Sequence, residues 1–176
     1  RPQVAPINRR NYHLGGFRSV NRDQFKPTVF KPSVLGTRCH QLAMYVVFEN
    51  PMPMVCDAPT AYEGQPGFDF IRQVPSTWDE TRVLSGNVGH YIVVARRKGA
   101  DWYLGAMTDW TPRVLEVPLT FLARGRYSVE TWADMVDSKD PNRVTFNQRT
   151  ANPTEKLELR LNSGGGQAIC IRPARE

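Results

Sequence analysis

With 176 residues, the chain is long enough for one well-packed core, or for one small domain and part of another. Its content of 40% hydrophobic and 23% charged residues is typical of a soluble globular protein. The longest apolar run, residues 42–48, is far shorter than the roughly 18 residues that a membrane span needs. The net charge of +6 is spread along the chain without a dense basic run, which argues against a nucleic-acid partner.

Residues 1–32 contain four prolines and little hydrophobic periodicity, which is typical of a long functional or disordered loop. At their centre, residues 11–18 read Asn-Tyr-His-Leu-Gly-Gly-Phe-Arg, and the paired glycines predict a flexible turn. The chain begins with Arg1 rather than Met, and no secretory signal peptide follows. We therefore expect a piece of a longer protein.

The clearest helix is predicted over residues 34–49, where apolar side chains recur every three or four positions, at Leu35, Cys39, Leu42 and Val46. Asn50 ends this helix because the residue before a proline avoids the helical conformation. A short apolar strand over residues 52–56 follows, which makes the helix and strand resemble half of a βα repeat.

Asp57 directly follows this short strand, at the position where α/β barrels place their working face. Asp57 could equally be a loop acid or the N-cap of the next helix, which a weaker periodicity predicts over residues 61–74. Pro75 ends that helix, and a domain boundary is expected between residues 75 and 78.

The rest of the chain reads as β structure. Within residues 77–113, two strands over 89–97 and 102–108 are joined by a turn at 98–101, the pattern of a hairpin. Further strands are predicted over 114–122, 126–133, 157–161 and 167–171, and a triple glycine at 164–166 precedes the last of them. The predicted fold class is therefore α+β, with the last helix-strand-helix units of a partial (β/α)8 barrel followed by a small antiparallel β-sandwich.

Acidic residues are the first candidates for chemistry. Asp79 and Glu80 are adjacent, so in an extended segment they point to opposite faces and cannot act on one substrate. We interpret them as loop acids, one of which pairs with Arg82 or Arg96. Asp57 alone makes no acid–base pair.

Thiol and imidazole groups give no site either. Cys39 and His40 are neighbours that project about 100° apart on a helix, with Cys39 on the apolar face, so they are not a nucleophile and its base. The three cysteines have apolar neighbours and no CxxC spacing, which predicts buried free thiols at Cys39, Cys56 and Cys170. The three histidines lack metal-binding spacing and are isolated, at His13, His40 and His90.

Aromatic residues of the β region admit two interpretations. An exposed row of them could stack on sugar rings, whereas buried rings would fill the core of the sandwich, which we favour. The residues concerned are Tyr91, Trp102, Tyr103, Trp110, Tyr127 and Trp132. By their chemistry alone, the residues of this chain do not compose a complete active site.

Several stretches together resemble the C-terminal part of glycoside hydrolase family 97, a family of α-glucosidases and α-galactosidases. Gly-Thr-Arg-Cys-His-Gln-Leu-Ala-Met-Tyr-Val-Val-Phe-Glu at 36–49 is similar to the family's last barrel helix region, and Met-Val-Cys-Asp-Ala-Pro at 54–59 to the strand that closes the barrel. The start of the family's C-terminal β domain is similar to residues 77–84, 91–99, 102–105 and 108–110, and the triple glycine matches as well.

The resemblance implies two domains: residues 1–75 as the C-terminal portion of a glycosidase barrel, and residues 76–176 as a C-terminal antiparallel β-sandwich. It implies a parent enzyme that hydrolyses α-glucosidic or α-galactosidic bonds by calcium-assisted carboxylate catalysis. The family's catalytic acid and calcium ligands lie upstream, so no catalytic or metal residue is assigned here, and the chain alone should be inactive.

The resemblance also implies the partners and the location of the parent. The partners are an α-linked oligosaccharide, the rest of the barrel and an N-terminal β domain, and the location is periplasmic or secreted. The loop at 11–18 resembles a family loop that usually reads Asp-Tyr-Thr-x-Gly-Gly/Ala, but this chain has Asn11 for Asp and His13 for Thr. We expect Asn11, Tyr12, His13 and Asp57 to lie near the substrate. The alternative is a standalone carbohydrate-binding or interaction β module.

Overall fold

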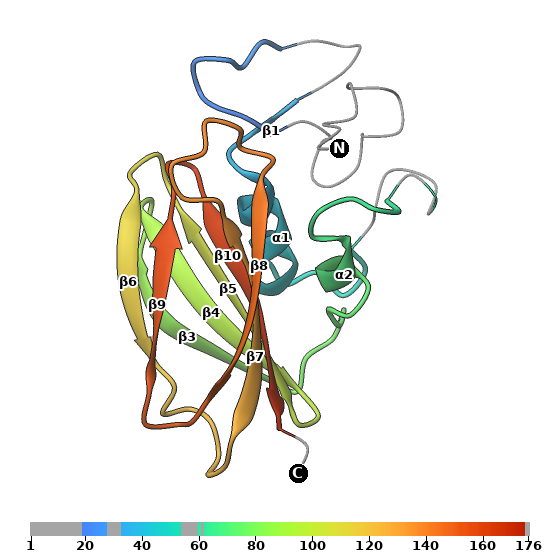
Figure 1. Ribbon diagram of the computed structural model, residues 1–176, viewed down its shortest axis with the longest axis vertical. Coiled ribbons are helices and arrows are strands. Elements are labelled where there is room, and N and C mark those ends of the chain that lie inside the picture. Colours follow the sequence, from blue (N-terminus) through green and yellow to red (C-terminus); the bar gives the residue numbers. More distant parts are fainter. Residues whose placement is uncertain (1–18, 28–32, 54–59, 61, 175–176) are drawn as a thin grey trace.

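A six-stranded antiparallel sheet, in the order β3-β4-β5-β10-β7-β8, is the centre of the structure (Figure 1). The structure is a computed structural model that describes residues 19–27, 33–53, 60 and 62–174. The strands of the sheet are β3 Glu80–Asn87, β4 Tyr91–Lys98, β5 Asp101–Thr108, β7 Tyr127–Asp134, β8 Val144–Ala151 and β10 Gly166–Pro173. The other elements are β1 Ser19–Val20, β2 Val34–Leu35, α1 Arg38–Val47, α2 Phe68–Ile71, β6 Arg113–Pro118 and β9 Lys156–Leu161.

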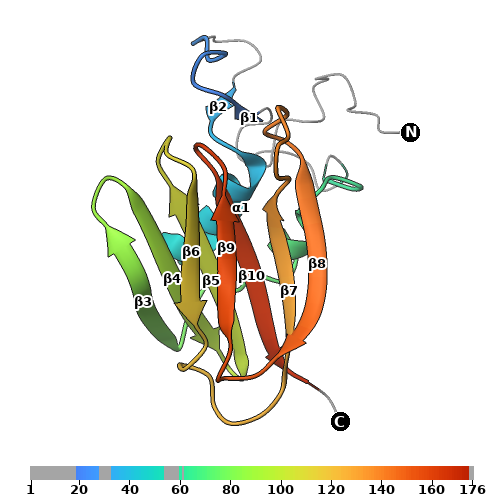
Figure 2. The same cartoon turned by 60° about the vertical axis from the view of Figure 1, so that its left-hand side comes forward.

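The antiparallel pair β6–β9 covers one face of the large sheet, as the rotated view shows (Figure 2). In β9, Leu157, Leu159 and Leu161 are buried while Glu158 and Arg160 point to solvent, so the predicted alternation is confirmed. The leucines pack into a core with Val93, Leu104, Val129 and Ile171 of the sheet. This packing makes the C-terminal region a β-sandwich.

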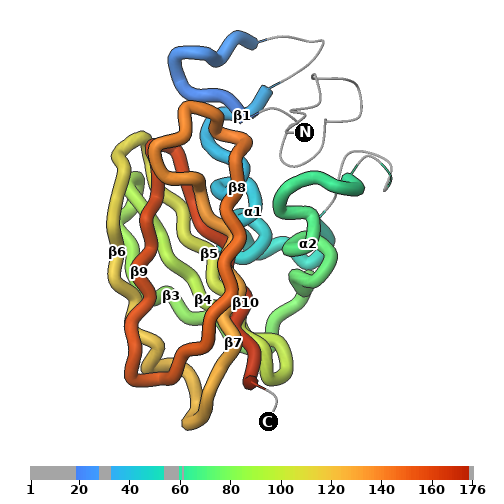
Figure 3. The backbone as a smooth tube through the Cα atoms, viewed as in Figure 1, coloured from blue at the N-terminus to red at the C-terminus, as the bar shows by residue number. Residues whose placement is uncertain are grey.

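Helix α1 covers the opposite face of the sheet, and α2 lies on the same side (Figures 1 and 3). The apolar stripe of α1 buries Leu42 and Val46 in a second core, together with Phe70 of α2 and Trp132 of β7. A Cβ atom on Gly105 of β5 would lie 2.8 Å from the Ala43 carbonyl oxygen, so this strand glycine is what lets the helix approach so closely.

Both ends of α1 receive polar groups suited to the helix dipole. At its N-terminus, the Thr37 side chain accepts a hydrogen bond from the His40 N–H at 3.1 Å. At its C-terminus, Arg96 donates to the Val47 carbonyl oxygen at 3.3 Å. A cationic group beside the last free carbonyls is favourable because the helix C-terminus carries partial negative charge. The sheet therefore holds the helix at its C-terminal end as well as by its apolar face.

Two predicted helices are shorter than the sequence suggested. The helix predicted over 34–49 begins at Arg38, because residues 34 and 35 pair with β1 and Gly36 has a left-handed backbone with φ of 98°. The helix predicted over 61–74 is only the single turn α2, because Gly67 before it is also left-handed, with φ of 87°.

Other strand predictions were corrected or remain open. The strand predicted over 114–122 ends at Pro118, since a proline cannot donate to a strand ladder. Strands β3 and β8 were missed. Of the strand predicted over 52–56, the described residues Met52 and Pro53 are not extended strand, and the rest lies outside the described residues. The pair β1–β2 is parallel, but a barrel end stays a prediction.

Candidate functional site

The residues predicted to lie near the substrate are Asn11, Tyr12, His13 and Asp57. All four lie outside the described residues, so their placement stays a prediction. The polar clusters of the described residues can be tested for chemistry. A site for glycoside hydrolysis needs two carboxyl groups that face each other across a space for the sugar.

Asp79 and Glu80 are tied into an ion-pair network at the end of the β4–β5 hairpin. Glu80 accepts from Arg82 at 2.6 Å and from Arg97 at 3.0 Å, which confirms the expected pairing with Arg82. Asp79 accepts from the Gly99 N–H at 2.7 Å and from Lys98 at 3.2 Å. These donors hold the pKa of both carboxyl groups below their ordinary values.

Arg96, the alternative partner of this acidic pair, lies on the other face of the sheet. It donates to Val47 of α1, and its guanidinium lies over the Trp78 ring at 5.9 Å. The acidic pair is therefore bound to donors other than Arg96, and these donors favour the ionised form of both carboxyl groups.

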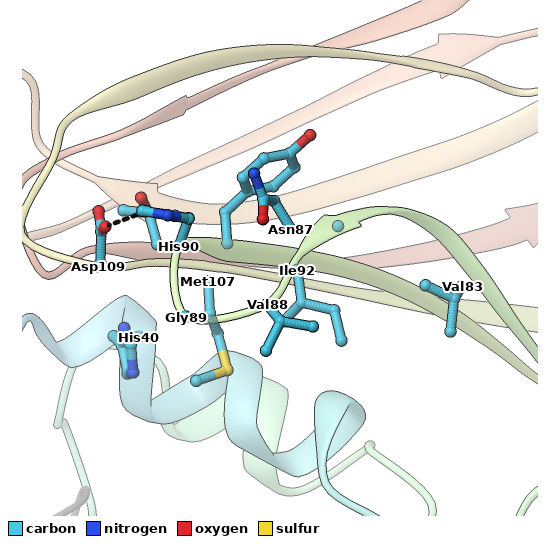
Figure 4. A pocket seen from close by; sticks show the side chains of 12 residues that line it. His40, Val83, Asn87, Val88, Gly89, His90, Ile92, Met107 and Asp109 are labelled. Carbon is cyan, nitrogen blue, oxygen red and sulfur yellow. Dashed lines mark hydrogen bonds and ion pairs between the residues drawn. The ribbon is translucent and has the colours of Figure 1, made fainter.

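A cavity of about 580 Å³ lies beside the β3–β4 turn and is bordered by titratable side chains (Figure 4). Val88 and Ile92 contribute apolar wall, and Met107 points toward α1. At one end His90 contacts Asp109, with 3.2 Å between Nδ1 and Oδ2. His40 of α1 borders the same cavity.

Among the described residues, this cavity is lined by a single carboxylate, Asp109, and so lacks the opposed pair that glycoside hydrolysis needs. Hydrogen bonds from Arg113 and from the Thr111 N–H hold the pKa of Asp109 far below its ordinary value, so this carboxylate stays ionised and paired. Burial lowers the pKa of His40, against the opposing effect of its 3.1 Å hydrogen bond to the Gly165 carbonyl. The cavity wall is otherwise apolar, which suits packing rather than hydrolysis.

Asp134 is the one carboxylate that is buried among the described residues, and sequence reasoning missed it. It accepts from the N–H groups of Gly166 at 3.0 Å and Asn162 at 3.3 Å, and so holds the triple-glycine turn against α1. Burial raises its pKa, opposed by these hydrogen bonds and by one from Thr37. The position of this aspartate at a strand end before a turn was the only signal in the sequence.

The cysteines are inert where they are described. Cys39 and Cys170 are buried free thiols, as predicted, and burial raises the pKa of both, that of Cys170 to about 12. A thiolate nucleophile is therefore not available at either position. The third cysteine, Cys56, lies outside the described residues.

The tryptophans are mainly core residues. Trp102 and Trp132 are 5% and 4% exposed, and each contacts another ring, Phe121 at 4.9 Å and Phe70 at 5.2 Å. Trp110 is half-buried with its ring against Gly164. The favoured interpretation of core packing is confirmed for Trp102 and Trp132, and these two rings offer no platform for a sugar.

The part of the chain that the structure describes contains no group of three or more His, Cys, Asp or Glu side chains that could hold a metal ion. It contains no helix long and apolar enough to cross a membrane.

Comparison with known proteins shows to which family these residues belong. The family model described as "Glycosyl-hydrolase 97 C-terminal, oligomerisation" matches residues 77–172. The chain belongs to glycoside hydrolase family 97. This confirms the resemblance on which the sequence predictions rest, and the match covers the β-sandwich from Thr77 to Arg172.

Two curated relatives extend the match toward the N-terminus. A "Retaining alpha-galactosidase" of Bacteroides thetaiotaomicron is 40% identical over 92% of this chain, which covers 25% of that protein. A "Probable retaining alpha-galactosidase" of Streptomyces bingchenggensis is 27% identical over 77% of this chain and 21% of that protein. The chain therefore spans about a quarter of the length of these relatives.

Solved structures agree with this placement. A family 97 enzyme from Pseudoalteromonas sp. strain K8, in complex with acarbose, matches 80% of this chain and 23% of its own, with 37% identity and a TM-score of 0.75. A beta-arabinopyranosidase matches 78% of this chain and 21% of its own, with 31% identity and a TM-score of 0.65. In each case this chain corresponds to a minor part of a larger glycosidase.

Proposed function

We propose that this chain is the C-terminal part of a family 97 α-glycosidase that hydrolyses α-glucosidic or α-galactosidic bonds. The observation that carries the proposal is the 40% identity to a retaining alpha-galactosidase over 92% of the chain. The catalytic acids lie upstream in the parent, so the chain alone is inactive. The carboxylates of the described sites support this, because Asp79, Glu80, Asp109 and Asp134 are all bound to donors of the chain itself.

The proposed domain division places residues 1–75 in the end of the catalytic barrel and residues 76–176 in the β-sandwich. The parallel pairing of β1 with β2 supports the first assignment, since barrel strands are parallel. The shared core of Leu42, Phe70 and Trp132 means that the two parts pack as one unit where they are described. In this arrangement the sandwich packs against the outer helices of the barrel and supports them.

Within that barrel, Asn11, Tyr12, His13 and Asp57 keep their proposed places near the substrate. Calcium is proposed for the parent only, because the described residues offer no group of ligands that fits a metal ion. The parent is proposed to be periplasmic or secreted. The description of the matched family model further supports a role for residues 77–172 in joining copies of the enzyme.

Expression of two chains of different length tests the catalytic proposal. The complete parent gene and the 176-residue chain are expressed side by side and assayed on p-nitrophenyl α-glucoside and α-galactoside. We expect hydrolysis by the parent, reduced when calcium is chelated, and none by the chain. A parent that lacks activity on both substrates, although folded, would overturn the proposed substrate class. The rival function, a standalone sugar-binding module, receives no support from the buried Trp102 and Trp132.

A further inference from the structure

Strand β8 is an exposed edge of the large sheet. It is last in the strand order, and no described strand pairs with its outer side (Figure 2). Its eight residues pair with β7 in an unbroken register, from Val144 opposite Asp134 to Ala151 opposite Tyr127. A regular edge of this length presents a row of N–H and C=O groups to any chain that can pair with it.

The opposite edge of the sheet, β3, differs from β8 in two ways. Its register shifts between Val83 and Ser85, which marks a bulge or irregularity that interrupts regular pairing. It also carries the charged side chains of Glu80 and Arg82. Irregular, charged edges are devices by which proteins prevent pairing between sheets, whereas β8 is regular and carries a single charged residue, Arg149.

The side chains of β8 suit pairing with another strand. The strand reads Val-Thr-Phe-Asn-Gln-Arg-Thr-Ala and contains no proline. Its one charged residue, Arg149, is balanced by Glu155 at 2.8 Å. Phe146 is 57% exposed although its ring lies 5.1 Å from Trp132, so an apolar surface continues beyond the edge of the core. A second strand alongside would cover this ring.

We propose that β8 pairs antiparallel with β8 of a second copy of this chain, so that the two large sheets become one. The proposal rests on the joining role proposed above for residues 77–172, which include the whole of β8. A second copy is the fitting partner because its β8 offers the same regular edge, in which the single charge of Arg149 is already paired with Glu155. Two such edges satisfy each other's backbone groups across a two-fold axis.

The geometry of strands restricts the register of this pair. A two-fold axis normal to the sheet keeps each face on its own side, so opposite residues must face the same way. One residue therefore stands opposite its own copy, and the axis passes midway between the two. Asn147, near the middle of β8, is the position we assign to the axis. This register places Phe146 opposite Gln148 and Arg149 opposite Thr145, so the two guanidinium groups stay apart.

Light scattering of purified chains tests the proposal. We expect the wild-type chain at twice its mass of 20.0 kDa. Asn147→Lys places two like charges directly opposite each other at the axis, and should shift the mass to that of one chain. The matched control is Val83→Lys on the other edge, a residue that is 68% exposed, and it should leave the double mass unchanged.

A cysteine substitution gives a second measurement, which can be made even if the lysine variant does not fold. With diamide as the added oxidant, Asn147→Cys should form a covalent dimer on a non-reducing gel, whereas Val83→Cys and wild type should not. A wild-type chain that is monomeric would overturn both the joining role and the β8 pairing. A dimeric wild type whose Asn147→Cys variant does not cross-link would overturn the β8 pairing alone. Neither result bears on the proposed glycosidase activity of the parent.

Discussion

Replacement of Gly105 by alanine tests whether α1 packs directly on the large sheet. A methyl group there would lie 2.8 Å from the Ala43 carbonyl oxygen and 3.0 Å from both Val46 and Val47. Ordinary contacts between such atoms are about 3.5–4.0 Å, so the helix must shift away from the sheet. Overpacking of this kind costs about 1–3 kcal/mol.

The net effect includes a gain in the unfolded state. Alanine restricts the unfolded chain more than glycine does, which stabilises a protein by about 0.4–1 kcal/mol where the native site accepts it. Gly86 of β3 is the matched control, because the nearest atom to a Cβ there is the Tyr91 carbonyl oxygen at 3.4 Å. The unfolded-state gain is shared by both variants and cancels, so we expect Gly105→Ala to be less stable than Gly86→Ala by the overpacking cost alone, about 2 kcal/mol.

Thermal and urea unfolding, followed by tryptophan fluorescence, measure this difference. For a chain of this size, about 2 kcal/mol corresponds to a difference in Tm of about 4–8 °C. Equal stability of Gly105→Ala and Gly86→Ala would mean that α1 does not rest on β5 at the observed distance. The claim that α1 and the large sheet share the second core would then fail.

Three further predictions concern Phe70, Asp109 and Tyr103. Phe70→Ala removes a fully buried ring from the second core and should lower the free energy of unfolding by about 3–5 kcal/mol in urea titrations; a loss below 1 kcal/mol would contradict its packing on Trp132. Because the folded pKa of Asp109 is lowered, wild type should lose stability relative to Asp109→Asn as the pH falls below the ordinary value of 3.8, and parallel pH profiles would refute this. Tyr103 should ionise at a pKa of about 12 in a tyrosinate absorbance titration, missing from Tyr103→Phe, because burial disfavours its charged form; ionisation near 10 would contradict that burial.

The elements that could be predicted are those in which the spacing of apolar residues along the chain matches the face that is buried in the fold. Strand β9 is an example, since Leu157, Leu159 and Leu161 alternate with charged residues and only one of its faces is buried. Strand β8 was missed because most of its residues are exposed on both faces, so no alternation marks it. Strand β3 was missed for a similar reason, because its residues are exposed or only half-buried and show no alternation.

Features that depend on distant residues could not be predicted from local patterns. The position of β10 between β5 and β7 brings together segments more than 30 residues apart, and the burial of Asp134 depends on that arrangement. The start of α1 was predictable in part, since Thr37 is a good N-cap residue. The pairing of Glu80 with Arg82 was predicted because the two residues are close in sequence and share a face of one strand.

The most direct measurement of the central claim is the glycosidase activity of the purified 176-residue chain itself. The chain is first shown to be folded by circular dichroism and is then incubated at high concentration with p-nitrophenyl α-galactoside and α-glucoside. A heat-unfolded sample of the Gly86→Ala variant serves as the blank. We predict that the folded chain releases no more p-nitrophenol than this blank. Release that rises with the concentration of folded chain, and that survives repurification, would show that these residues contain an active site and would contradict the account.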